Sequence, residues 1–526
     1  MRFFNTAGPV RCEKHYCLPP LTRFDLDEIL SLIDQEKYFV LHAPRQTGKT
    51  TCLLALMDYL NREGKYYCLY FNVEMAQSAR EDVSRGIKTI LGEIGSQARN
   101  FLQDPSIDDT WPDALNKYGG DGALREILAR WAQDSPKPLV LLIDEIDALV
   151  GDTLISVLRQ LRTGYPNRPS FFPQSIVLCG VRDVRDYRIH SDSEKAIITG
   201  GSAFNIKAKS LRLGNFTRAE VETLYKQHTE ETGQSFEPKV MDLVWDLTSG
   251  QPWLVNAIGY ETCFEMKNGR DRSQPIMTEM VIEAKENLIL RRETHLDQLA
   301  DKLKEERVRK VIEPVLAGEG SPDLISTDDI QYVRDMGLIR TEGELRIANL
   351  IYQEIIPREL TYSTQLTISQ EPSWYIQSFD GHLDIDRLMA SFQQFFRQHS
   401  EHWIERFDYK EAGPQLLLQA FLQRIVNSGG RVEREYGLGR MRTDLLVVWP
   451  YPGGVQQVVI ELKLTNGSLS SVIEKGLRQT AEYADRCGAD EAHLVIFNRD
   501  KNKTWEEKIF SRQETCQGKQ IKIWGM

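Results

Sequence analysis

One short segment constrains the fold of this chain more than any other feature. Residues 43–50 (APRQTGKT) lie between an apolar run, Tyr38–His42, and a segment of helical periodicity that Gly64 would end. In such a place, backbone N–H groups and a helix N-terminus surround phosphates, while Lys49 neutralises their charge and Thr50 binds Mg²⁺. The segment therefore predicts a P-loop that binds ATP. The expected nucleotide contacts are Ala43, Pro44, Arg45, Gln46, Thr47, Gly48, Lys49, Thr50 and Thr51.

A second apolar run ends in acidic residues. Leu139–Ile143 is followed directly by Asp144 and Glu145. Acids at the carboxyl end of a buried parallel strand lie where open α/β sheets bind their ligands. We expect Asp144 to hold Mg²⁺ through water and Glu145 to polarise the attacking water, which indicates ATP hydrolysis. Asp147 is expected to be a helix N-cap.

Two more strands complete the predicted core. Tyr67–Val73 follows the helix after the P-loop, and Ser175–Leu178 is apolar throughout, so the pattern predicts a parallel sheet covered by helices. Arg182 follows the last strand and is expected near the γ-phosphate, with pairing to a neighbouring aspartate as the alternative. Arg159 and Arg162 are candidates for contacting ATP in a neighbouring subunit or are solvated, which leaves a homo-oligomer open.

Changes of pattern along the chain divide it into domains. A capping box formed by Thr217 and Glu220 opens a helical region, and a polar stretch closing with Pro372 indicates a linker. We expect an N-terminal linker (1–20), an α/β core (21–213), a helical lid (214–290), a winged helix (291–358), a linker with a helical segment (359–400) and a second α/β domain (401–526).

Composition places the chain among soluble, cytoplasmic proteins without a membrane segment. No apolar run is long enough to span a bilayer, and residues 1–9 lack the charged-then-apolar pattern expected of a signal peptide. The eight cysteines are scattered without CxxC pairs and predict buried, unpaired thiols that are neither zinc ligands nor disulfides. For the close pair Cys12 and Cys17, with His15 between them, a metal site is the alternative. The net charge of −11 argues against a surface coated with basic residues, although residues 401–526 are nearly neutral and so less repulsive to a phosphate backbone.

The last quarter contains acids and a lysine on neighbouring strands. Asp444 precedes the apolar run 445–448, and a turn leads to Val458–Lys463, where Glu461 and Lys463 share one face. If the two strands pair, Asp444 meets Glu461. Such carboxylates can hold one or two Mg²⁺ ions that activate water against a phosphodiester, and the lysine can stabilise developing charge. An amphipathic helix is expected over 415–426, and the ligand role of Glu411 is unassigned.

The first 358 residues resemble the STAND and archaeal-type ATPases of the AAA+ lineage. The resemblance rests on residues 21–23 (LTR), the P-loop, the acidic strand and residues 250–252 (GQP) in the lid, over about residues 10–358. One departure is Ala43, where the motif has glycine. The resemblance implies that Gly250 and Pro252 help close the nucleotide pocket, with Pro252 near the adenine, and that a winged helix follows. Many members of this lineage act as ATP-gated switches.

Residues 405–500 resemble the PD-(D/E)xK nuclease superfamily. Asp444 and the segment 461–463 (ELK) match its core, and Gln479 with Tyr483 matches the QxxxY motif of RecB-type members. The resemblance implies an α/β restriction-endonuclease-like domain in which Gln479 and Tyr483 join the catalytic group. Together the two resemblances predict an ATP-gated, Mg²⁺-dependent nuclease acting on DNA or RNA, with defence as an analogy of fold. The alternative is an ATP-driven signalling switch or scaffold whose nuclease-like domain only binds.

Overall fold

The computed structural model describes most of the chain. The described residues are 1–191, 196–291, 293–317, 325–341, 345–360, 375–377, 380–406, 418, 421–422, 430–438, 441–465, 469–498 and 503–526. They form two compact units. The first unit contains Met1–Asp297, Ile330–Arg340 and Ala348–Ile351, and the second contains Gln298–Asp329, Thr341–Ile347 and Tyr352–Met526.

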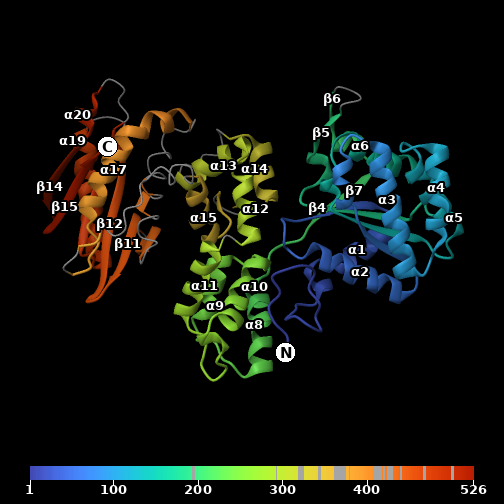
Figure 1. Ribbon diagram of the computed structural model, residues 1–526, viewed down its shortest axis with the longest axis horizontal. Helices are drawn as coiled ribbons and strands as arrows, with labels where there is room; N and C mark the ends of the chain where they lie inside the picture. The colour runs from blue at the N-terminus through green and yellow to red at the C-terminus, as the bar shows by residue number, and fades with distance from the viewer. Residues whose placement is uncertain are drawn as a thin grey trace. The chain divides into compact units, whose positions relative to one another are not determined.

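A five-stranded parallel sheet forms the centre of the first unit, as predicted (Figure 1). Its order is β2-β3-β4-β1-β7, and every neighbouring pair is parallel. The strand before the P-loop thus lies between β4 and β7 in the sheet interior. The strands are β1 (Tyr38–His42), β2 (Tyr67–Asn72), β3 (Leu139–Asp144), β4 (Ser175–Gly180) and β7 (Lys207–Arg212).

Helices cover both faces of this sheet. Successive side chains of a strand point to opposite faces, so Phe39 and Leu41 pack with Leu53, whereas Tyr38 and Val40 join a separate cluster. The strands β1, β3 and β4 are buried at every position, which explains their unbroken apolar runs. The covering helices are α1 (Leu26–Asp34), α2 (Lys49–Glu63), α3 (Val83–Gln97), α4 (Ser106–Tyr118), α5 (Ala123–Asp134) and α6 (Gly151–Gly164).

Two glycines bound the helix that follows the P-loop. Gly48 precedes α2 with φ 92°, and Gly64 follows it with φ 74°, both in the left-handed region that favours glycine. The predicted end of this helix at Gly64 is therefore confirmed. A small hairpin of β5 (Arg188–Ser191) and β6 (Ala196–Thr199), with α7 (Gly200–Ala203), precedes β7.

A group of helices follows the sheet. The predicted capping box is present: the Thr217 side chain accepts the N–H of Glu220, and the Glu220 carboxylate accepts the N–H of Thr217. Helix α8 begins there and ends at Gly233, which has φ 75°. The helices of this group are α8 (Arg218–Thr232), α9 (Val240–Thr248), α10 (Pro252–Tyr260) and α11 (Thr278–Leu290).

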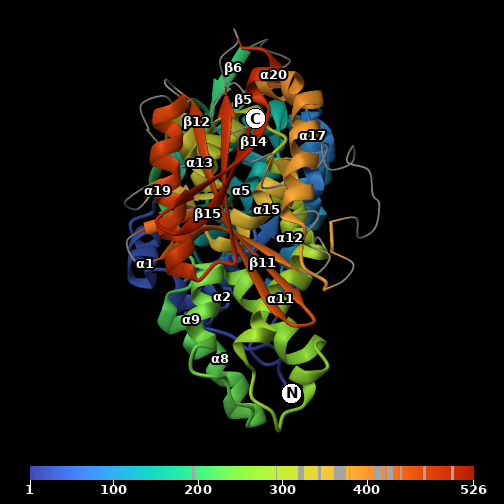
Figure 2. The ribbon, with the colours of Figure 1, turned by 90° about the vertical axis from the view of Figure 1, so that its left-hand side faces the viewer.

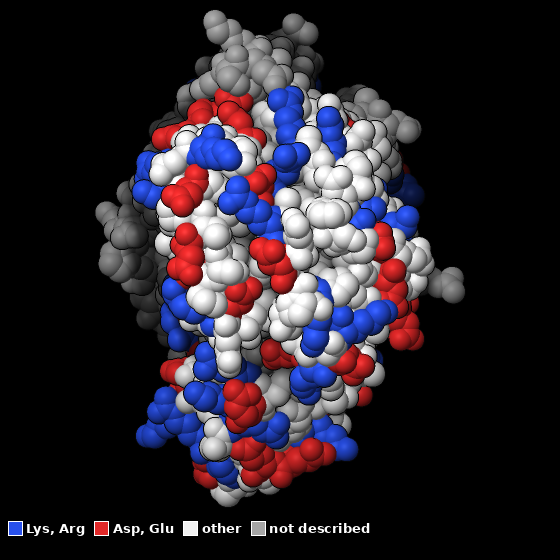
Figure 3. Space-filling view, turned by 90° about the vertical axis from the view of Figure 1, so that its right-hand side faces the viewer, with Lys and Arg blue, Asp and Glu red and all other residues white. Residues whose placement is uncertain are grey.

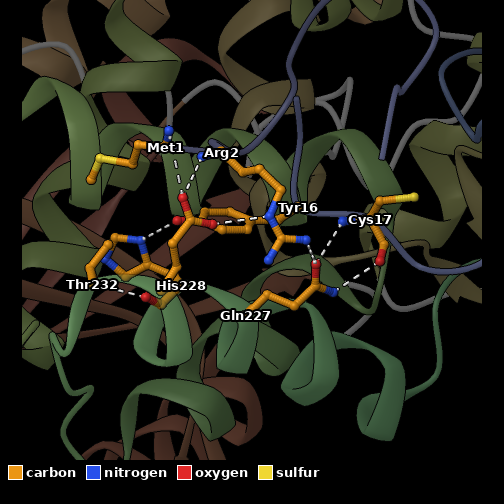
Figure 4. A network of polar contacts seen from close by, with 8 residues as sticks. Met1, Arg2, Tyr16, Cys17, Gln227, His228 and Thr232 are labelled. Atoms are coloured by element: carbon orange, nitrogen blue, oxygen red, sulfur yellow. Dashed lines mark hydrogen bonds and ion pairs between the residues drawn. The ribbon is translucent and has the colours of Figure 1, made fainter. Parts of the chain in front are cut away.

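The first residues of the chain pack against α8. The rings of Phe4 and Tyr16 are buried and contact Tyr225 and His228 of that helix. Figure 4 shows the polar contacts: Tyr16 Oη lies 3.1 Å from His228 Nδ1, and the backbone N–H of Cys17 donates to Gln227 Oε1 at 3.1 Å. Residues 1–18 are thus anchored to a helix more than 200 positions later in the sequence.

The prediction of unpaired thiols was wrong for Cys12 and Cys17, which form a disulfide. A turn explains their proximity, because the N–H groups of Lys14 and His15 both donate to the carbonyl of Arg11. This turn brings the two Cα atoms to 5.1 Å. The other six cysteines are free thiols.

Short helices and strands connect the lid to the second α/β domain. The winged helix predicted here stays a prediction, as do the domain boundaries. The elements are α12 (Thr294–Lys302), α13 (Glu306–Ala317), α14 (Thr327–Asp335), β8 (Ile339–Arg340), β9 (Arg346–Ile347) and α15 (Leu350–Leu360). Within the described ranges, no helix combines the length and apolar character needed to cross a bilayer.

The second unit contains a six-stranded mixed sheet of order β10-β11-β12-β13-β15-β14. Antiparallel pairs lie at both ends, and β13 is parallel to both of its neighbours. The strands are β10 (Arg431–Leu438), β11 (Met441–Tyr451), β12 (Gly454–Thr465), β13 (Glu491–Asn498), β14 (Phe510–Cys516) and β15 (Lys519–Gly525).

Helices α17 (Ile385–Arg406) and α19 (Leu469–Cys487) pack on this sheet (Figure 2). Phe392 of α17 clusters with Val458 and Ile460, whereas Leu477 of α19 clusters with Leu494 in a separate core. The two helices therefore cover opposite faces. A short helix, α20 (Trp505–Lys508), precedes β14. Glu411 and most of the helix predicted over 415–426 lie outside the described residues.

Candidate functional site

The predicted P-loop joins β1 to α2 and is tightly folded. Gln46 and Gly48 have φ of 58° and 92°, and Ala43 keeps a negative φ, so alanine fits the position where the motif has glycine. Lys49 is buried, and its Nζ donates to the carbonyls of Ala43 at 3.0 Å and Pro44 at 3.1 Å. The ammonium group is thus held over the loop, where it can neutralise anionic oxygens.

The acid at the end of β3 meets the P-loop hydroxyl. Thr50 Oγ1 donates to Asp144 Oδ2 at 2.7 Å, although the two residues are 94 positions apart. The N–H of Glu145 donates to Asp144 Oδ1 at 2.9 Å, so both carboxylate oxygens are held in place. A hydroxyl and a buried carboxylate side by side are the oxygen ligands that suit Mg²⁺. These residues therefore fit the predicted ion.

Tyr70 is a member of this site that the sequence analysis missed. It lies on β2, next to β3 in the sheet, and its hydroxyl donates to Asp144 Oδ2 at 3.0 Å. Burial raises the pKa of the Tyr70 phenol, and the nearby Asp144 raises it further, so the hydroxyl stays a donor. The signal in the sequence was a phenol near the carboxyl end of an otherwise apolar strand.

Glu145 has an unusual backbone and a half-buried carboxylate. Its φ of 55° lies in the left-handed region, which costs a non-glycine residue about 1–2 kcal/mol. Burial raises the pKa of Glu145, and the charge of Lys49 opposes that rise. The local strain and the shifted pKa are both features that cluster at functional sites.

Asp147 does not cap a helix, so that prediction was wrong. It lies inside the 3-10 helix Ile146–Ala148, and its Oδ1 accepts the backbone N–H of Val181 at 3.2 Å. Val181 directly follows β4, so this bond ties the ends of β3 and β4 together.

Arg182 packs between two aromatic rings. Its guanidinium carbon lies 4.9 Å from the ring centroid of Tyr187 and 4.7 Å from that of Tyr332 on α14. Its neighbour Asp183 pairs with Lys207, both being buried. Arg182 is thus at the carboxyl end of β4 as expected, and its contact with the γ-phosphate stays a prediction.

The lid closes one side of a pocket beside the P-loop. Gly250 has φ 72°, its carbonyl accepts the N–H of Phe216 at 2.8 Å, and Pro252 opens α10. Phe216 and Pro252 line a pocket, together with Gly48 of the P-loop and residues 5–8 of the N-terminal segment. Apolar walls next to a P-loop suit the flat ring of a nucleotide base.

Strands β11 and β12 bring the C-terminal acids together. Leu445 pairs with Ile460, so Asp444 and Glu461 are neighbours, and Asp444 Oδ2 accepts the N–H of Leu462 at 2.8 Å. Lys463 Nζ donates to Glu461 Oε1 at 2.6 Å. Burial raises the pKa of Glu461 to about 7, and the charge of Asp444 adds to the shift.

One of the two α19 residues of the predicted site, Tyr483, packs with Leu446 and Val459 on the sheet face that bears this group. Burial raises the pKa of Tyr483, and the carboxylates of Glu461 and Asp444 raise it further, which places the phenol near both acids. The buried Gln479 Oε1 and Glu461 Oε2 have no hydrogen-bond partner among the described residues. An orphaned carboxylate oxygen suits a bound cation. Among the described residues, no group of three or more His, Cys, Asp or Glu side chains is arranged so that it could hold a metal ion.

Comparisons with known proteins match part of the chain. A family model described as an AAA-like domain matches residues 27–354. The Walker-type ATPase of Pyrococcus abyssi is 14% identical, with 67% of this chain and 99% of that chain covered and a TM-score of 0.45. Cdc6p from Pyrobaculum aerophilum is 17% identical, with 69% and 96% covered and a TM-score of 0.35.

A third similar structure is the RuvB Holliday junction branch migration motor of Thermotoga maritima. It is 13% identical, with 63% of this chain and 95% of that chain covered and a TM-score of 0.33. No protein with a curated description matches the sequence.

Proposed function

The chain belongs to the AAA-like domain family, and from this premise we propose that it binds Mg²⁺-ATP at the P-loop and hydrolyses it. The observation that carries the proposal is the 2.7 Å contact between Thr50 Oγ1 and Asp144 Oδ2, next to the buried Lys49. Distant segments of the sequence thus supply a cation, a hydroxyl and a carboxylate to one edge of the sheet.

Each residue has a distinct part in the proposed reaction. Lys49 and the backbone N–H groups of the loop bind the phosphates, and Thr50 with Asp144 would hold Mg²⁺. When bound, the ion neutralises charge that develops on the phosphoryl oxygens. Glu145 orients the attacking water and accepts its proton, for which the carboxylate must be ionised. The nearby Lys49 favours that ionised form.

Two substitutions separate binding from hydrolysis. Lys49→Ala should abolish nucleotide binding, whereas Glu145→Gln should keep ATP bound and lower turnover by roughly 10²- to 10⁴-fold, the usual contribution of a general base. Lys65→Ala, which removes an exposed lysine on the same unit, is the matched control. Calorimetric titration and phosphate release measure the two effects. A folded wild-type chain that retains no nucleotide would contradict the proposal.

We further propose that the second unit is a metal-dependent nuclease whose activity depends on the nucleotide state of the first. Support comes from the close grouping of Asp444, Glu461 and Lys463 and from the unpartnered Glu461 Oε2. Asp444 and Glu461 would hold the ion, which supplies an activated water, and Lys463 would stabilise charge on the phosphodiester. Gln479 and Tyr483 would orient these groups.

The nuclease assay needs three nucleotide states and two metals. We expect cleavage of DNA or RNA with Mg²⁺ or Mn²⁺ to differ between ATP, a non-hydrolysable analogue and no nucleotide. Asp444→Ala and Lys463→Ala should abolish cleavage without changing ATP turnover. Lys475→Ala on the exposed side of α19 is the control for lost positive charge.

The alternative is an ATP-driven switch or scaffold whose C-terminal domain binds without cutting. The small number of acids at the site favours it, since the described residues supply only Asp444 and Glu461. Figure 3 shows a face of the first unit, the one bearing α4 and α5, where basic and acidic side chains are intermixed and form no basic stripe for nucleic acid. Binding without cleavage in every nucleotide state would favour this alternative.

A further inference from the structure

The pocket beside the P-loop has two walls from distant parts of the chain. On the lid side, Phe216, Leu224 and Pro252 provide apolar surface. On the other side, the N-terminal segment spans from lid to P-loop helix: Trp253 Nε1 donates to the Thr6 carbonyl at 2.9 Å, and the N–H of Val10 donates to Thr51 Oγ1 at 3.0 Å.

One polar side chain in this pocket has an unused acceptor. Asn256 of α10 lines the pocket and is only 6% exposed. Its Nδ2 donates to the Pro252 carbonyl at 2.8 Å, which fixes the orientation of the amide. Its Oδ1 is therefore the free end, and this atom has no hydrogen-bond partner among the described residues. A buried, unpartnered acceptor is unfavourable unless a ligand supplies a donor.

Purine bases differ in the group that would meet this oxygen. Adenine presents a donor, its 6-amino group, where guanine presents a carbonyl acceptor. We infer that Asn256 selects adenine over guanine by accepting a hydrogen bond from that amino group. The inference rests on the proposed binding of a nucleotide at the P-loop and adds which base the site takes. Asn256 Oδ1 would accept a hydrogen bond from the 6-amino group of adenine and would repel the carbonyl oxygen of guanine.

The comparison that tests this uses three triphosphates on the full chain: ATP, GTP and purine riboside triphosphate, which lacks any group at position 6. Wild type should bind ATP about fivefold to tenfold tighter than the purine analogue, as one hydrogen bond contributes. GTP should bind more weakly than either. Asn256→Ala and Asn256→Leu should bind ATP and the purine analogue equally.

A matched control separates base recognition from damage to the lid. Thr262 is buried beyond α10, and its hydroxyl donates to the carbonyl four residues earlier, at Ile258, as Asn256 does to Pro252. Thr262 does not line the pocket. Thr262→Val should therefore keep the wild-type ratio of affinities even if all three triphosphates bind more weakly.

The outcomes distinguish this inference from the proposed function. Wild type that binds ATP and the purine analogue equally, or Asn256 variants that keep the wild-type ratio, would overturn the role of Asn256 while leaving nucleotide binding intact. A folded wild type that binds none of the three triphosphates would overturn both.

Discussion

Gly250→Ala tests whether the lid is held in place by close backbone contact. A Cβ at Gly250 would lie 2.0 Å from the Phe216 carbonyl oxygen and 2.9 Å from the Trp245 ring, at a backbone φ of 72°. Gly233 is the matched position, because it ends α8 with φ 75° and a Cβ there would have no atom within 4 Å. The two substitutions share the backbone strain and differ only in crowding.

The magnitudes follow from these contacts. Alanine in the left-handed region costs about 1–2 kcal/mol, which is all that Gly233→Ala should lose. At Gly250 the Phe216 carbonyl must also move, which breaks the 2.8 Å bond between Phe216 N–H and Gly250 O. That bond contributes about 0.5–1.5 kcal/mol, before any cost of repacking. Gly250→Ala should therefore destabilise the lid by about 1.5–3.5 kcal/mol.

Hydrogen exchange measures this locally, which suits a chain of several domains. Amides of α8, α9 and α10 should exchange roughly 10- to 300-fold faster in Gly250→Ala, given tenfold for each 1.4 kcal/mol. Gly233→Ala should show roughly a tenfold effect confined to the end of α8. Nucleotide affinity should fall only in Gly250→Ala, because Phe216 lines the pocket. Equal effects of the two substitutions would refute the reasoning.

Three other perturbations test contacts elsewhere in the chain. Tyr70→Phe removes a donor to the Asp144 carboxylate and should raise the Mg²⁺ concentration needed for half-maximal ATP hydrolysis about tenfold, with Tyr67→Phe on the same strand unchanged. Because the pKa of Glu461 is raised in the folded chain, the folded state keeps its proton to higher pH than the unfolded chain, so stability falls as pH rises from 4.5 to about 7. Urea unfolding of the second unit at pH 5 and pH 8 should show this fall in wild type and much less of it in Glu461→Gln. Thr217→Ala should destabilise α8 by about 1 kcal/mol through loss of its cap, visible as faster exchange at its first turn, and unchanged exchange there would contradict the capping argument.

Local patterns predicted the elements that carry the P-loop site. Strand Tyr38–His42 begins and ends where its apolar run does. A strand that is buried on both faces is apolar at nearly every position, so the limits of the apolar run mark the limits of the strand. Alternation of period two likewise predicted that Glu461 and Lys463 share a face, and their side chains are in contact.

Contacts between distant residues were not predictable in the same way. Phe4 and Tyr16 lie in the segment predicted as an N-terminal linker, and only the folded chain shows that Phe4 packs on Tyr225 and Tyr16 on His228. The contact of Tyr332 with Arg182 depends on a helix about 150 positions later, and no local pattern in the sequence predicts such a contact. That Asn256 Oδ1 is an unused acceptor follows only from the folded chain, in which the Nδ2 of the same side chain donates to the Pro252 carbonyl.

The sheet order has a consequence for synthesis on the ribosome. The apolar strand β1 emerges before its neighbours in the sheet, β4 and β7; Val177 of β4, for example, lies beside Phe39. Until those strands have been translated, β1 has no edge to pair with and its apolar side chains are exposed to aggregation. Nascent chains that end before residue 180 should therefore depend on chaperones, whereas chains extended past residue 212 should become resistant to protease.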